Sequence, residues 1–258
     1  SVPMAIPGAL PDCSAAVADV EAAIPLHIQG YDNGTGLPTA CNTALSGRKA
    51  GTDVVLVRRV STCVADDADA TCPDDAGELY FQASQCNAEL ATATKYRLST
   101  STNAATFDRH RRGSDCATAP LADKRRFITH VYYIANNNEA GDGVPTLKRA
   151  ELRNGSFTTI TPLAEGIEQL ELEYGIDTSG DGAPDGSYSS SPADPGEWAN
   201  VMAVEINLLA RSTDPSPGHV DSKTYVLGAD SFTPAGSYKR HVFQTTVRLS
   251  NPAGLRQQ

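Results

Sequence analysis

One short segment has the residue types and spacing of a metal-binding loop. Residues 177–185 read Asp-Thr-Ser-Gly-Asp-Gly-Ala-Pro-Asp, so that a carboxylate stands at every fourth position. Calcium prefers oxygen ligands, about six to eight of them, in a flexible and tightly turned loop. The segment therefore predicts a calcium site built from side-chain oxygens and one main-chain carbonyl. The predicted ligands are Asp177, Ser179, Asp181, Ala183 through its carbonyl oxygen, and Asp185.

This loop is not an EF-hand, because Tyr188 stands where that motif has its bidentate glutamate. Asp194, Glu197, a water molecule or a main-chain carbonyl could complete the coordination. The alternative is a polar hairpin loop held by Asx turns, without a metal. We expect the metal, because three acids around Gly182 otherwise repel one another. Its predicted role is structural, since a bound ion would fix the connection 177–198.

The rest of the sequence has no arrangement typical of an enzyme. The five histidines are dispersed, and no pair has the His-Glu-x-x-His spacing of a zinc protease. No Gly-x-Ser-x-Gly nucleophile motif occurs. His130 stands in an apolar run, where we expect a hydrogen-bonded core residue rather than a ligand. The sequence thus predicts no catalytic residues, and a secreted hydrolase is disfavoured.

The charge of the chain argues against nucleic-acid binding by this protein alone. Its formal net charge is −10, so its overall field repels phosphates. A basic run at residues 109–112 and a second at 124–126 stand out against this background. We expect both to pair with surrounding acids on a solvated face. The alternative is a contact with another subunit or with a nucleic acid.

The cysteines indicate export to an oxidising compartment. All six lie in the first half, and no two of them form a Cys-x-x-Cys pair. Three disulfides are the better interpretation, and buried free thiols of a cytosolic protein are the alternative. Pairing each cysteine with its nearest neighbour is the simplest connectivity, although the sequence alone does not choose among the possibilities. That pairing joins Cys13 to Cys41, Cys63 to Cys72, and Cys86 to Cys116.

Strands precede and follow the metal-binding loop. Gly166 to Tyr174 alternates between apolar and polar residues, as does Val201 to Leu209. In the first of these strands, the side chains predicted to face inward are Leu170, Leu172 and Tyr174, and those predicted to face outward are Gln169, Glu171 and Glu173. Trp198, between the two strands, is expected to fill the core. Few helices are expected, and Ser14 is the predicted cap of one that ends at Ala23.

Other segments complete a mostly antiparallel pattern. Phe127 to Ala135 is apolar on both faces, which is typical of a central strand. Asn154-Gly155 is a strong hairpin turn, because both residues accept a positive φ. Tyr238 to Leu249 is the last predicted strand, and its predicted apolar side chains are Phe243, Val247 and Leu249. The sequence therefore predicts an α+β fold that is mostly antiparallel β, and no segment approaches the ~20 apolar residues of a membrane span.

Four stretches of the chain resemble the PilW-type minor pilins of bacterial type IV pili. They cover less than half of the sequence and occur in the order that the family shows. The most specific are the GIEQLELEYGIDT segment and the final stretch. The four are Gly51 to Arg59; Phe127 to Asn137, reading FITHVYYIANN; Leu163 to Asp185, reading LAEGIEQLELEYGIDTSGDGAPD; and Arg240 to Asn251, reading RHVFQTTVRLSN.

The resemblance implies a minor-pilin head similar to that of the J-type pseudopilin of type II secretion. Such proteins normally begin with a leader and a long hydrophobic helix, which this chain lacks. It would then be a single pilin-like globular head over residues 1–258. Within it, residues 1–126 would form a disulfide-rich half, and residues 127–258 a strand-rich half that carries the calcium loop.

The resemblance also implies a non-enzymatic role in pilus assembly. Minor pilins of this type form a tip complex that primes assembly, and pili support twitching motility, adhesion and DNA uptake. The implied partners are other minor pilins and the major pilin, with no small-molecule substrate. The implied locations are the inner membrane and periplasm before assembly, then the extracellular pilus tip. The alternative function is a secreted calcium-dependent adhesin or binding module, with calcium as the structural cofactor in either case.

Overall fold

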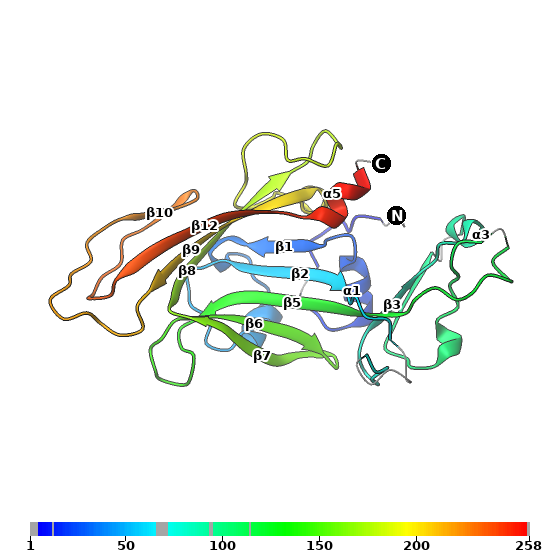
Figure 1. Ribbon diagram of the computed structural model, residues 1–258, viewed down its shortest axis with the longest axis horizontal. Helices are drawn as coiled ribbons and strands as arrows, with labels where there is room; N and C mark the ends of the chain where they lie inside the picture. Colours follow the sequence, from blue (N-terminus) through cyan, green and yellow to red (C-terminus); the bar gives the residue numbers. More distant parts are fainter. Residues whose placement is uncertain (1–4, 12, 66–71, 93–94, 114, 257–258) are drawn as a thin grey trace.

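The computed structural model describes residues 5–11, 13–65, 72–92, 95–113 and 115–256, and shows mostly antiparallel β-sheet with a few short helices (Figure 1). The α+β, mostly antiparallel class predicted from the sequence is confirmed at this level. No helix among these residues is long and apolar enough to cross a membrane.

The larger sheet contains strands from both halves of the chain. Within the described residues it has seven antiparallel strands, in the order β1-β2-β5-β3-β4, with β6 beside β5 and β7 beside β6. The strands are β1 (Ile28–Tyr31), β2 (Val54–Val60), β3 (Tyr80–Ala83), β4 (Tyr96–Ser99), β5 (Arg125–Ala135), β6 (Thr146–Arg153) and β7 (Ser156–Glu165). The predicted turn between β6 and β7 is confirmed, because Asn154 and Gly155 both have positive φ, 47° and 75°.

A smaller sheet packs against the larger one. It has the order β12-β9-β8, and a separate hairpin pairs β10 with β11. The bounds are β8 (Ile167–Ile176), β9 (Val201–Arg211), β10 (Tyr225–Leu227), β11 (Asp230–Phe232) and β12 (Arg240–Arg248). β8 pairs with β9 in an antiparallel register that places Leu172 opposite Ile206. The long alternating segments of the sequence are therefore the strands that carry this sheet.

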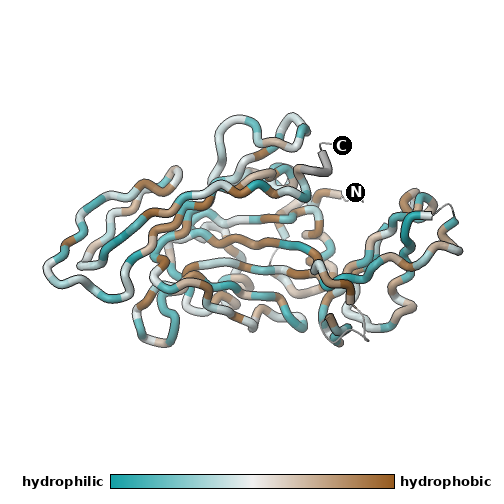
Figure 2. Tube along the Cα trace, in the orientation of Figure 1, coloured by the Kyte–Doolittle hydropathy of each residue, from teal (hydrophilic) through white to brown (hydrophobic). Residues whose placement is uncertain are grey.

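Apolar side chains fill the space between the two sheets. Val55 and Ile134 of the larger sheet pack in one cluster with Leu172 and Tyr174 of β8, and Trp198 is buried there as predicted. A second cluster on the opposite face of β2 and β5 is built around Tyr133. Figure 2 shows hydrophobic residues gathered along these central strands. β5 is thus buried on both faces, which confirms it as a central strand.

The helices are short and lie in the connections. They are α1 (Val17–Ala23), η1 (Asp32–Gly34), α2 (Thr39–Ala44), α3 (Asn87–Leu90), η2 (Ala104–Thr106), α4 (Pro195–Ala199) and α5 (Ser250–Arg256). The predicted cap of the first helix is wrong, because Ala16 occupies the cap position and no side chain caps it. Ser14 Oγ instead accepts a hydrogen bond from the N–H of Ala16, which is a turn that competes with capping.

One end of the molecule is a disulfide-braced projection, which we call the stapled lobe (residues 61–124). It carries β3, α3 and β4, and it is the part of the larger sheet that extends past the ends of β1 and β2 (Figure 1). Disulfides join Cys63 to Cys72 and Cys86 to Cys116 within it, and a third joins Cys13 to Cys41 in the body. The cysteines therefore pair with their nearest neighbours along the chain, and no free cysteine remains among the described residues.

The opposite end is a projection without cysteines, which we call the arm (residues 212–239). It leaves the end of β9, carries the β10–β11 hairpin, and returns into β12 (Figure 1). The outgoing and returning segments of the arm are joined by backbone hydrogen bonds, such as the one that Ser216 N donates to Ser237 O at 2.7 Å. The arm lies beside β8 and β9 and therefore covers part of the smaller sheet.

Candidate functional site

The predicted calcium loop follows β8 directly and is held by its own aspartates. Asp177 is buried, with 1% of its surface exposed. Its Oδ1 accepts a hydrogen bond from Gly180 N at 2.6 Å, and its Oδ2 accepts one from Gly182 N at 2.8 Å. Both oxygens therefore bond to backbone N–H groups within the loop and hold its turns.

Asp185 and Asp181 act in the same way. Asp185 Oδ2 accepts hydrogen bonds from the N–H groups of Ser179 and Thr178, at 2.7 and 2.8 Å. These bonds lower the pKa of Asp185. Asp181 Oδ1 accepts one from Ala183 N at 2.8 Å. The repulsion that argued for a metal is thus relieved in part by backbone N–H groups.

The predicted ligands do not form a carboxylate cage as they are placed. In the described part of the chain, the only three metal-ligating side chains whose ligand atoms come within 4.8 Å of one another lie elsewhere. Asp177, Asp181 and Asp185 are therefore neighbours in sequence whose carboxylates do not meet. Calcium binding by this loop, with Ser179 and Ala183 as further ligands, stays a prediction.

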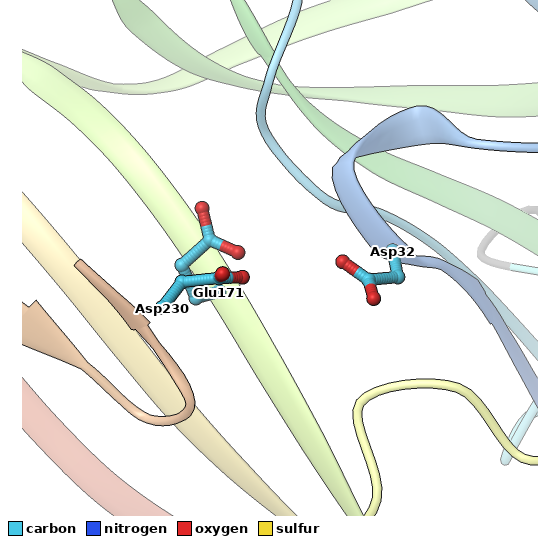
Figure 3. A group of neighbouring side chains, drawn as sticks. All are labelled: Asp32, Glu171 and Asp230. Carbon is cyan, nitrogen blue, oxygen red and sulfur yellow. The ribbon is translucent and has the colours of Figure 1, made fainter. Parts of the chain in front are cut away.

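The three acids that do meet come from distant parts of the sequence. Asp32 belongs to η1, Glu171 to β8 and Asp230 to β11 (Figure 3). Asn33 Nδ2 donates hydrogen bonds to Asp32 at 2.9 Å and to Asp230 at 3.4 Å. Sequence reasoning missed this group, because no local spacing connects its members.

Burial makes Glu171 of this group and the neighbouring Asp53 harder to ionise. Glu171 is 5% exposed. Its burial, followed by the nearby charge of Asp53, raises its pKa to about 9. Asp53 is also buried, which raises its pKa to about 7 although it accepts hydrogen bonds from Asn33 N and Leu172 N, both at 2.7 Å. The centre of the molecule therefore contains acids that resist ionisation.

The outward face of β8 is not solvated, which corrects the prediction. Gln169 and Glu171 are buried, because other segments cover the face opposite the core. Lys49 Nζ lies 3.5 Å from Gln169 Oε1, and the β10–β11 hairpin covers the strand near Glu173. Alternation showed correctly which residues share a face, but it could not show that a distant segment covers the polar one.

A buried ion-pair network anchors the arm. Arg240 lies at the start of β12 with 1% of its side chain exposed. It contacts Glu168 at 2.6 Å and Asp221 of the arm at 3.1 Å. Tyr225 of β10 donates to Asp221 at 2.9 Å. Because Glu168 belongs to β8, one guanidinium joins the smaller sheet to the arm.

The basic runs of the sequence pair with acids, as predicted. Arg111 and Arg125 share Asp123, at 2.6 and 2.9 Å, and Lys124 pairs with Asp74. Arg109 pairs with Asp108 at 2.8 Å. These contacts brace the stapled lobe, so the alternative of a nucleic-acid surface has no support from their arrangement.

His130 is a core residue, as predicted. Its Nε2 lies 3.3 Å from Glu151 Oε2, and Arg126 contacts the same glutamate at 2.9 Å. Burial lowers the pKa of His130, although Glu151 opposes this effect. Arg126 also reaches Glu78, which pairs with Arg153 at 2.6 Å. This cluster lies where the stapled lobe joins the larger sheet.

The last strand is more exposed than its pattern predicted. Phe243 is 54% exposed and Val247 is 43% exposed, whereas Leu249 packs against the core. β12 pairs with β9 along one edge, and the described residues offer it no partner on the other. The apolar stripe of β12 is therefore the surface feature that most needs an explanation.

Comparisons with known proteins found one solved structure and one curated sequence that are similar to this chain. A type IV-like pilin of known structure from Thermus thermophilus is similar over 78% of each chain, with 13% identity and a TM-score of 0.38. A curated relative, UDP-N-acetylenolpyruvoylglucosamine reductase of Mycolicibacterium smegmatis, is 28% identical over 113 residues, or 40% of this chain. The match spans only 31% of the length of that reductase.

The family match covers the strand-rich half. Residues 131–251 match the family described as Type IV Pilus-assembly protein W. The range begins within β5 and ends after β12, so it includes the whole smaller sheet, the arm and the loop at residues 177–185. The resemblance to this family that the sequence showed is therefore confirmed over residues 131–251.

Proposed function

We propose that this chain is a non-enzymatic minor pilin, the structural head of a subunit in a type IV pilus tip complex. The family match over residues 131–251 supports this proposal most directly. In this role the protein primes pilus assembly, and so supports twitching motility, adhesion or DNA uptake. It would act at the inner membrane and periplasm first, and at the extracellular tip after assembly. Its partners are other minor pilins and the major pilin.

The observation that carries the docking mechanism is the open edge of β12. An unpaired strand edge presents a row of N–H and C=O groups that a strand of another chain can pair with. β12 is nine residues long and carries exposed Phe243 and Val247 beside Leu208 and Val204 of β9. We infer that a neighbouring pilin subunit pairs with this edge and covers this stripe.

The inference is tested by recovering the partners of β12 variants. A tagged full-length protein is expressed in a piliated bacterium that encodes it, cross-linked in the cells, and purified. We expect pilin subunits to be recovered with the unchanged protein. Phe243→Asp together with Val247→Asp should lower that recovery by roughly tenfold, because a charge replaces each apolar anchor.

Val220→Asp is the matched control, since Val220 is exposed on the arm and is not part of the paired strands β9 and β12. Its recovery of pilins should equal that of the unchanged protein, and twitching motility should follow the same order. Equal recovery from the β12 double variant would contradict docking through this edge. Binding of a host glycan that a chelator abolishes, without pilin recovery, would favour the adhesin alternative.

The predicted calcium ion at residues 177–185 is a separate question from assembly. A bound structural ion would raise the melting temperature of the isolated protein at millimolar calcium. Asp185→Asn would then remove that increase, because it takes away one carboxylate ligand. An unchanged melting curve in the absence and presence of calcium would show that Asx turns alone hold the loop.

A further inference from the structure

The group formed by Asp32, Glu171 and Asp230 has the donor atoms of a hard-cation site. One oxygen from each carboxylate lies within 4.8 Å of the others. The side chains come from η1, β8 and the tip of the β10–β11 hairpin, and they converge on the space between these segments (Figure 3). Carboxylates held together by separate strands of a folded chain repel one another unless a proton or a cation lies between them.

Glu171 supplies a second observation. Its residue is 95% buried, since 5% of its surface is exposed, and its side chain reaches toward Asp230 and Asp32. Among the described residues, no N–H or hydroxyl group donates a hydrogen bond to its carboxylate, and its one side-chain hydrogen bond is to Asp230, another acid of the same group. A buried carboxylate normally has a backbone N–H, a hydroxyl or a cation as its partner. Glu171 lacks all three, so it points at a position that a cation would fill.

No basic side chain of the described residues neutralises this group. None forms an ion pair with Asp32, Glu171 or Asp230. Lys49 is the basic residue whose charge acts on Glu171, but its Nζ donates to the carbonyl oxygen of Glu168 at 2.9 Å. The three carboxyl groups therefore have no basic partner in the described part of the chain, so that either a proton on Glu171 or a bound cation must separate them.

We propose that Asp32, Glu171 and Asp230 bind one calcium ion, which fastens the arm to the body. Calcium fits better than magnesium, because the donors are all carboxylate oxygens on separate segments whose spacing can adjust. Magnesium demands near-ideal octahedral geometry and usually keeps several waters. Hydrogen bonds hold two of the carboxylates in place. Asn33 Nδ2 donates to both Asp32 and Asp230, and Ser190 Oγ donates to Asp32 at 3.0 Å.

The binding test compares this group with the loop at residues 177–185. Calcium chloride is titrated into the purified unchanged protein, Glu171→Gln and Asp185→Asn, with binding measured by calorimetry. We expect one ion at this group, with an affinity typical of extracellular sites, roughly 10⁻⁴ to 10⁻³ M. Glu171→Gln should weaken binding by roughly tenfold or more, because the site loses a charged ligand. Asp185→Asn should keep the ion at this group and lose only the separate ion predicted at residues 177–185.

Hydrogen exchange locates the ion independently. Calcium should slow exchange at residues 225–232 in the unchanged protein and not in Glu171→Gln, while magnesium at the same concentration has a smaller effect. Asp230→Asn provides the same test from an exposed ligand if Glu171→Gln does not fold. The proposal is overturned if the unchanged protein binds no calcium, if the Glu171 and Asp230 variants bind it equally well, or if only Asp185→Asn abolishes binding.

Discussion

The two ends of this molecule are held by different kinds of interaction. The stapled lobe is closed by the disulfides Cys63–Cys72 and Cys86–Cys116, and salt bridges on its surface add to them. The arm has no cysteine and is held at its base by the buried side chain of Arg240. The first end is braced by covalent bonds and the second by charge.

The difference matters because a disulfide acts mainly on the unfolded chain, whereas a buried ion pair acts in the folded protein. A disulfide stabilises mainly by restricting the unfolded chain, so its contribution does not depend on a precise set of neighbours. A buried ion pair contributes only while each partner is present, because removal of one partner leaves an uncompensated charge. The arm should therefore respond to single substitutions and to cations, and the lobe to a reductant.

Arg240→Met should have the largest effect. The substitution leaves Glu168 and Asp221 without their buried partner, which costs about 3–5 kcal/mol of unfolding free energy. Urea unfolding measures the total, and hydrogen exchange should accelerate in the arm before the lobe. Arg59→Met is the control, because Arg59 is exposed and should change stability by less than about 0.5 kcal/mol. An arm that stays protected in Arg240→Met would show that charge does not anchor it.

Removal of the Cys86–Cys116 disulfide should come next. Replacing both cysteines by serine should lower the unfolding free energy by about 2–5 kcal/mol. The sequence separation of this pair is 30, against 9 for Cys63–Cys72, so loss of the shorter bridge should cost less. Chemical denaturation measures both, and exchange should rise in the lobe and not in the arm. A loss of protection in the arm as well would mean that the two ends are coupled.

Acid should loosen the junction between the lobe and the body. Burial raises the pKa of Glu151, but Arg126 and His130 outweigh this effect, so the pKa in the folded protein lies below its ordinary value of about 4.5. A lowered carboxylate pKa stabilises the fold above about pH 4.5. This contribution is lost as the pH falls through the folded pKa. The lowered pKa of His130 acts in the same direction, because its protonation below about pH 6.5 opposes folding.

Unfolding measured from pH 8 to pH 3 checks this sign. Stability should decline toward acid, and Glu151→Gln should be less stable by about 1–2 kcal/mol at neutral pH with a flatter acid limb. A matching pH profile in the variant and the unchanged protein would remove Glu151 from the explanation.

The smallest effect is expected on the outer face of the arm. Val226 is 67% exposed on β10, so Val226→Ser should change the unfolding free energy by less than about 0.5 kcal/mol. Thermal and urea unfolding should both be unchanged. A larger loss would mean that the arm is stabilised along its length and not only at its base.

Much of the fold could be predicted from local pattern. The strands β8 and β9 lie where alternation placed them and β12 lies within its predicted range, and Asn154-Gly155 forms the expected turn. The central position of β5 followed from apolar residues on both of its faces. These features depend on neighbours in sequence, which is why periodicity and turn chemistry detect them.

The candidate sites could be predicted only where they are local. The aspartates at residues 177–185 were found by spacing, yet their carboxylates accept backbone N–H groups and do not converge. The acids that do converge were missed, because Glu171 reads as the outward residue of an alternating strand. Likewise, the apolar residues of β12 read as a buried face, although Phe243 and Val247 are exposed.

The sequence alone determined the strands, their faces, the export implied by the cysteines, and the family resemblance of the second half. Only the tertiary structure decided which faces are covered, because coverage depends on where the arm and the η1 loop pack. A polar face lies open or buried according to segments far away in the chain. Asp32, Glu171 and Asp230 are far apart in the sequence, and only the packing of the arm and the η1 loop on β8 brings their carboxyl groups together.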